Sequence, residues 1–261
     1  MQPFYQLTLW MILVVCCACA EEETCLDGKH LFSLGPEWSK IYRTRASGTR
    51  QSGWSCGARF NYQRLKRYHF YWGIEAFYGR GSLGGETQSE DKLKSDLIDG
   101  MVEAQFGYTF AQKFGCRASF TPFASAGYAC EQHNYRKPSP IPVHFKIEYW
   151  YAGGGFLSSI ALSNKVSIGL NGKIHWMLDA TNKITHDPKY EKSKQLVKNE
   201  INYRIELPLQ YRTTYCSNRL FFLVTPFYEF RHYGHQVNFP FDFLETKLWM
   251  KGITVQIQYL I

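Results

Sequence analysis

The stretch Ile201-Asn-Tyr-Arg-Ile-Glu-Leu-Pro-Leu-Gln-Tyr211 alternates between two kinds of side chain. Its odd positions are large and apolar or aromatic, and its even positions hold Asn, Arg, Glu, Pro and Gln. Successive side chains of a β-strand point to opposite faces of the sheet. The stretch therefore predicts a strand with one apolar face and one polar, charged face.

This alternation returns along most of the chain, in segments of about the length that crosses a bilayer when tilted. The final segment runs to the last residue, with Ile253, Val255, Ile257, Tyr259 and Ile261 on one face. The segments are 52–64, 70–79, 98–110, 120–128, 147–157, 166–178, 201–211, 220–231 and 247–261. Repeated two-faced strands of this kind predict an all-β, transmembrane antiparallel up-and-down β-barrel.

The connections between these segments alternate in length. Short connections at 65–69, 111–118, 159–165 and 213–218 take turns with long polar ones at 81–96, 131–143, 179–198 and 232–245. Outer-membrane barrels have tight turns on the periplasmic side and long loops outside. The pattern therefore predicts which end of the barrel faces the outside.

The same alternation constrains the number of strands. If the last strand ends on the periplasmic side, the strand at 52–64 begins outside, and one more strand must precede it. The segment Trp38–Ser47 is the candidate, with 48–51 as its loop. We expect about ten strands, and eight if one hairpin is misassigned.

The first residues have the features of an export signal. Residues 7–20 are mostly apolar, and Ala18-Cys19-Ala20 places small residues before Glu21. We expect a signal peptide at 1–20 that is cleaved near Ala20, a periplasmic segment at 21–36 and a barrel at 37–261. A lipoprotein is the alternative, because Cys16, Cys17 and Cys19 lie in the same stretch.

The chain resembles the outer-membrane β-barrel superfamily in residues 38–261. The resemblance is carried by the alternation at 253–261, by the strand Phe120-Thr-Pro-Phe-Ala-Ser-Ala-Gly-Tyr128 and by the turn pattern. It implies a protein of the bacterial outer membrane. Five cysteines follow the signal, which weakly resembles chlamydial disulfide-linked envelope proteins. Of these, Cys116 and Cys216 fall in short turns and are candidates for a disulfide with each other or with another envelope protein.

A fainter resemblance is to the omptin proteases, through the barrel size and the segment from His144 to Trp176. Omptins carry two aspartates one residue apart on one rim loop and an Asp-x-His pair on the opposite rim. Here the corresponding loops hold Glu90-Asp91 with Asp96, and His186-Asp187 in the reverse order. Neither spacing is met, so an omptin-like protease or a lipid-modifying enzyme is an alternative and not the preferred function.

Many polar positions of the predicted strands are charged, and we expect these side chains to face the lumen. They are Arg59, Glu75, Asp99, Glu103, Glu148, Lys173, His175, Arg204, Glu206, Arg212, Glu229 and Arg231. A barrel of eight to ten strands is mostly filled by its own side chains. A closed lumen plugged by salt bridges is therefore expected, and a narrow solute channel is the alternative.

Other sites are not predicted. His133, His232 and His235, with Glu229, lie near the expected outer rim, but residues three apart on a strand face opposite ways, so we expect surface histidines and no metal. The net charge of +8 does not indicate nucleic-acid binding, because the basic residues alternate with apolar ones. The lysine-rich loop 179–198 suits lipopolysaccharide or other outer-membrane lipid. We expect no catalytic residues, no cofactor, and a structural or surface-interaction role through the external loops.

Overall fold

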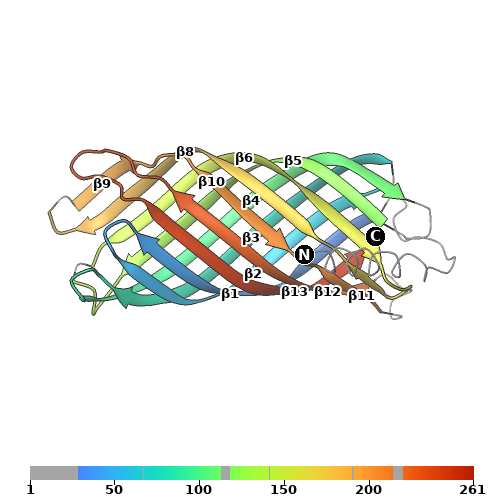
Figure 1. Cartoon of the computed structure of the whole chain (residues 1–261), viewed down its shortest axis with the longest axis horizontal. Coiled ribbons are helices and arrows are strands. Elements are labelled where there is room, and N and C mark those ends of the chain that lie inside the picture. Colours follow the sequence, from blue (N-terminus) through green and yellow to red (C-terminus); the bar gives the residue numbers. More distant parts are fainter. Residues whose placement is uncertain (1–28, 67, 113–117, 141, 190, 214–219) are drawn as a thin grey trace, which may run out of the picture.

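The computed structural model describes residues 29–66, 68–112, 118–140, 142–189, 191–213 and 220–261. Within these ranges the chain is an elongated cylinder of tilted antiparallel strands (Figure 1). The strands are β1 (Lys29–Arg45), β2 (Arg50–Leu65), β3 (His69–Glu86), β4 (Lys92–Gln112), β5 (Ala118–Tyr135), β6 (His144–Ala161), β7 (Val166–Ile168), β8 (Asn171–Asp187), β9 (Glu191–Leu196), β10 (Ile201–Glu206), β11 (Leu209–Arg212), β12 (Leu220–Tyr233) and β13 (Thr246–Leu260). No helix in the described residues is long and apolar enough to cross a membrane.

The sheet closes on itself through its first and last strands. β1 pairs with β2 on one side and with β13 on the other, from Leu31 opposite Leu260 to Arg45 opposite Thr246. Backbone bonds between His30 and Ile261, at 3.1 and 2.9 Å, complete this seam. The predicted fold class, an antiparallel barrel, is therefore confirmed.

The structure divides the barrel into thirteen strands where about ten were expected. The difference arises in two interrupted passes. β7 and β8 form one pass, and both pair with β6. β9, β10 and β11 form the other, in which β9 and β10 pair with β8 and β11 pairs with β7. The predicted strand 201–211 breaks at Pro208, which has no N–H for the ladder. Its carbonyl accepts a bond from the amide of Gly169, in the break between β7 and β8, at 2.8 Å.

The four long external loops were overestimated. β3 continues to Glu86 and β4 begins at Lys92, which leaves only 87–91 of the expected loop 81–96. The other connections shrink to 136–143, 188–190 and 234–245 for the same reason. At the start, β1 begins at Lys29, so residues 29–36 belong to the barrel and not to a separate periplasmic segment. The signal at 1–20 and the candidate disulfide cysteines Cys116 and Cys216 lie outside the described residues.

The loops were overestimated because the apolar face changes sides along the strands. In the lower part of β4, Val102 and Phe106 are exposed on the outer face while Glu103 is buried inside. In the upper part of the same strand, Leu93 and Leu97 are buried inside. A barrel needs an apolar exterior only where lipid surrounds it. The end remote from the termini therefore has the polar exterior and apolar interior of a soluble protein.

Candidate functional site: the filled lumen

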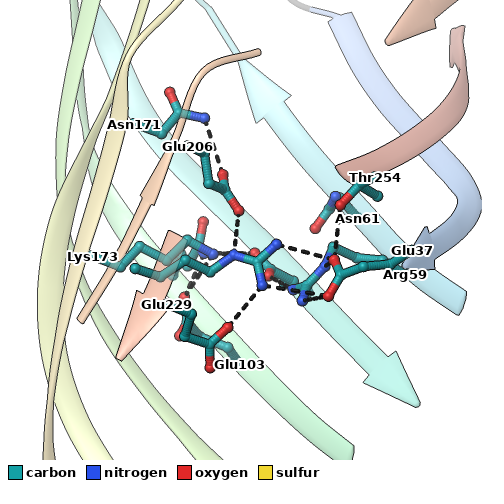
Figure 2. Close-up of polar contacts among 12 residues, drawn as sticks. Glu37, Arg59, Asn61, Glu103, Asn171, Lys173, Glu206, Glu229 and Thr254 are labelled. Carbon is teal, nitrogen blue, oxygen red and sulfur yellow. Dashed lines mark hydrogen bonds and ion pairs between the residues drawn. The ribbon is translucent and has the colours of Figure 1, made fainter. Parts of the chain in front are cut away.

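A belt of buried charges crosses the middle of the lumen, and Arg204 on β10 is one of its centres. The Arg204 guanidinium donates to Glu37 at 3.0 Å, to Glu206 at 2.7 Å and to Glu229 at 2.8 Å. These carboxylates come from β1, β10 and β12. Figure 2 shows Glu37 on one side of the lumen and Glu206 on the other. Arg204 therefore ties β10 and β12 to β1, beyond β13 in the sheet.

Arg59 on β2 links the first strands to the same belt. It donates to Glu37 at 3.0 Å and also to Glu75 on β3. Glu75 in turn pairs with Lys173, which arrives from β8 on the far wall. Thr254 on β13 donates to Glu37 at 2.8 Å. Every strong acceptor here has a donor, which is the condition for holding charges away from water.

Glu103 on β4 gathers a second group of donors. Gln105 donates to it at 2.5 Å and the Tyr151 hydroxyl at 3.1 Å. His175 Nε2 lies 2.7 Å from the same carboxylate, and the His175 ring stacks on Tyr151 with centroids 4.4 Å apart. Lys173 lies 3.7 Å away and joins this group to Glu75. The two groups thus form one continuous network.

Arg231 on β12 extends the network towards the outer end. It donates to Glu229 at 2.6 Å, to Asp99 at 2.9 Å and to Glu131 at 3.2 Å. Glu131 also accepts from the Tyr233 hydroxyl at 2.8 Å, and it lies 2.7 Å from His133 Nε2. Glu131 itself is 1% exposed, so this part of the belt is shielded from solvent.

The lumen differs on the two sides of the belt. Towards the chain termini lies a cavity of about 260 Å³ whose lining mixes uncharged polar, apolar and charged side chains. Its amide and hydroxyl groups come from Ser33, Asn61, Gln63, Ser119, Thr121, Ser158, Ser167, Asn171, Gln210, Gln256 and Gln258. Towards the other end the interior is an apolar plug. It includes Ile41, Leu83, Leu97, Met177 and Leu248 from the strands, and Phe243 from the 234–245 connection.

Most of the charged residues predicted for the lumen lie there. Arg212 is also inside, below the belt, where its guanidinium stands 5.4 Å from the Phe221 ring centroid. Glu148 is the exception, and that prediction is wrong. Its carboxylate pairs with Lys146 and Lys183, each at 2.5 Å, and both lysines lie on the outer surface. The β6–β8 register shifts between Glu148 and Trp150, in the part of the barrel whose exterior is polar.

His133 was expected at the surface and is instead buried, at 0% exposure, on the inner face of β5. Sequence reasoning also missed Glu37 and Glu131. Glu131 falls in a segment interpreted as a loop. Glu37 lies within β1, one residue before the strand expected at Trp38–Ser47, whose alternation is obscured by Ser39 and Arg43. In both cases the only signal in the sequence is that the residue occupies an inward-facing position. That position can be recognised only once the strand is known to extend that far.

The rim residues compared with omptins do not assemble in the described residues. Asp91 accepts from Ser89 at 2.7 Å within its own turn, and Asp96 pairs with Arg136 at 2.8 Å. The His186 ring lies tilted against the His144 ring, with centroids 4.3 Å apart. His232 lies 2.7 Å from Glu245. Among the described residues no group of three or more His, Cys, Asp or Glu is placed to hold a metal.

Chemically, the belt fixes charge, and the cavity of about 260 Å³ lies between it and the chain termini. Its carboxylates and cations neutralise one another at hydrogen-bond distance, and the apolar plug closes the lumen beyond it. The arrangement therefore ties strands of the barrel wall together. The carboxylates of Glu75 and Glu206 line this cavity and are engaged by Arg59, Lys173 and Arg204.

The chain is similar to several solved β-barrels. The outer-membrane protease OmpT from Escherichia coli matches with a TM-score of 0.57 at 10% identity, over 92% of this chain and 99% of that one. OprG from Pseudomonas aeruginosa matches at 0.38 and 9% identity, over 90% and 97% of the two chains. The autotransporter AIDA-I transport unit from Escherichia coli matches at 0.41 and 9%, over 94% and 96%. No family model and no curated protein matches the chain. The likeness to OmpT shows the fold, an antiparallel β-barrel.

Proposed function

We propose that this protein is an integral barrel of the bacterial outer membrane, exported with a signal cleaved near Ala20. In this proposal its lumen is closed and its outer end binds another macromolecule. The fold supports the location. The filled lumen supports the role, because the belt and the plug leave the exterior as the surface available for recognition.

The connection 234–245 carries the proposal. Phe239 at its tip is 92% exposed and Val237 is 70% exposed. Large apolar side chains at a loop tip are costly in water unless a partner covers them. The exposed fractions are therefore unusual for a surface that serves only to connect two strands.

This tip is held in place by its own neighbours. Asn238 lies between the two exposed residues. Its side chain accepts from the Leu196 amide at 2.7 Å and donates to the Leu196 carbonyl at 2.9 Å. Phe243 is buried in the plug at 2% exposure. A loop anchored in this way presents its apolar side chains in a fixed geometry, which lowers the entropy cost of binding.

The adjacent strand adds charge to the same end. In the described residues β9 pairs only with β8, and its other edge meets the 234–245 connection through side chains. Lys192 and Lys194 are exposed on β9. The surface therefore combines an apolar tip with a basic edge, which suits a partner that carries both apolar and acidic groups.

Site-specific crosslinking on intact cells tests the proposal. A photo-crosslinking amino acid at position 239 is expected to capture a macromolecule. The same group at position 137, an exposed site in the β5–β6 connection, serves as the matched control. Crosslinks of equal yield at both positions, or to lipid alone, would contradict a binding role for the tip.

Two further assays address the alternative functions. Ion conductance above leak in planar bilayers would indicate a channel, and cleavage of dibasic peptides by the refolded protein would indicate an omptin-like protease. We expect neither activity, because the lumen is filled and the rim acids and histidines are engaged with other partners.

A further inference from the structure

Two lysines face each other on the membrane side of the barrel seam. Lys40 on β1 and Lys251 on β13 are direct partners in the register of these strands. Both belong to the outward face, Lys40 between Trp38 and Tyr42 along its strand. Like charges directly opposite on neighbouring strands destabilise a sheet. Something must offset that repulsion.

Aromatic rings frame the two ammonium groups. Lys40 Nζ lies 5.3 Å from the ring centroid of Tyr42 and 5.8 Å from that of Trp54. Lys251 Nζ lies 6.0 Å from the ring centroid of Tyr228. Trp54 and Tyr228 are also the register partners of the two lysines on β2 and β12. The pair is thus walled on both sides by rings that favour cations but do not neutralise them.

Neither lysine has a carboxylate partner among the described residues. Other outward lysines do have one. Lys247 lies 3.0 Å from Glu245, and Lys198 lies 3.3 Å from Glu200. The Lys40–Lys251 pair therefore lacks the counter-charge that these two lysines have.

The position of the two lysines on the outer face places them at the edge of the apolar band of the barrel. Below Lys251 the outward residues of β13 are apolar, from Ile253 and Val255 to Ile257 and Tyr259. Trp249 lies directly above it on the same face. Aromatic girdles mark the level of the lipid headgroups in such barrels. The two ammonium groups therefore stand where headgroup phosphates lie, and lysines reach that level by extending along apolar surface.

We propose that Lys40 and Lys251 together bind the phosphate of one membrane-lipid headgroup, with Tyr42, Trp54 and Tyr228 as the walls of the site. A phosphate monoester offers up to two negative charges and several acceptor oxygens, so it pairs with two ammonium groups at once. This lipid contact lies at the membrane seam and is independent of the macromolecular surface at the outer end.

Unfolding of the refolded protein in vesicles tests the site. Wild type and a Lys40→Gln, Lys251→Gln double variant are compared in phosphatidylcholine alone, with added phosphatidic acid, and with added phosphatidylglycerol as a charged phosphodiester. Heat-dependent gel mobility reports the unfolding temperature. Phosphatidic acid is expected to raise that temperature for wild type more than phosphatidylglycerol does. The double variant should lose this difference.

Two controls keep the result decisive. The Lys247→Gln variant removes a lysine with its own carboxylate and should respond to phosphatidic acid like wild type. An equal phosphatidic acid effect in wild type and double variant would overturn the proposal. Inorganic phosphate added to phosphatidylcholine vesicles should not change the unfolding temperature. A higher unfolding temperature would show that the site binds a free anion and not a lipid.

Discussion

Arg204 shows how a single side chain holds this barrel together. It contacts three carboxylates on three strands and is itself 4% exposed. Such a group contributes little net stability relative to an apolar replacement of the whole cluster, but its removal alone leaves uncompensated buried charge. The sequence placed Arg204 on the inner face correctly through the alternation around it. Its partners were not predictable, because Glu37 comes from a strand that is remote in sequence.

We predict that Arg204→Met lowers the free energy of unfolding by about 3–5 kcal/mol, since Glu37, Glu206 and Glu229 lose their shared donor. Urea unfolding of protein refolded into lipid measures the change. Arg136→Met is the matched control, because its pair with Asp96 is largely exposed and worth less than about 1 kcal/mol. Similar losses in the two variants would show that the belt does not depend on Arg204.

At the scale of the strand, β4 shows why the inward and outward faces could be predicted for one half of a strand and not for the other. Its lower half alternates as a lipid-facing strand should, with Phe106 outside and Glu103 inside. Its upper half has Lys94 outside and Leu97 inside, so the rule that apolar residues face outward no longer holds. A pattern that assumes a lipid-facing exterior cannot detect the part of a strand that extends beyond the membrane. For the same reason the positions of Glu148 and His133 were predicted wrongly.

The assignment of inward and outward faces in β10 and β11 can be tested by introducing a charged side chain on each face. Ile205 on β10 is 47% exposed on the outer face, and Ile205→Arg is expected to cost roughly 2–4 kcal/mol near the middle of the membrane. Gln210→Arg should cost much less, because Gln210 lines the cavity of about 260 Å³ and can be replaced by a longer polar group. Refolding yield and urea stability in lipid vesicles compare the two. Equal costs would refute the face assignment.

Extended strands also change where proteases should cut. Proteinase K added outside intact cells is expected to cleave within 87–91 and 234–245, where the chain leaves the ladder. It should spare 81–86 and 92–96, whose backbone groups are paired between β3 and β4. Mass spectrometry of the fragments locates the cuts. Cleavage in the short turns at 65–69 or 159–165 under these conditions would reverse the orientation.

In the molecule as a whole, two layers of side chains fill the lumen: the belt of buried charges and the apolar plug. The overall barrel was predictable because its exterior repeats one pattern over most strands. The plug was not, because Phe243 and Val143 enter from connections in which nothing in the sequence distinguishes a buried residue from an exposed one.

Two independent closures predict that opening one of them leaves the barrel non-conducting. Phe243→Ser with Leu248→Ser loosens the plug, and Glu229→Ser with Arg231→Ser loosens the belt. Each pair alone is expected to stay at leak level in planar bilayers, while the four changes together should conduct. Conductance in wild type, or in one pair alone, would show that the remaining layer does not seal the lumen.

The seam between β1 and β13 has a consequence for the order of folding. Almost every other pairing joins neighbours along the chain and can form as a local hairpin, whereas this one joins the two segments farthest apart. Until β13 is made, β1 has a free edge. Joining the ends and reopening the chain at 87–91 would turn the seam into a local hairpin and transfer the slow encounter to β3 and β4. Folding kinetics of such a circular permutant would show whether closure sets the rate.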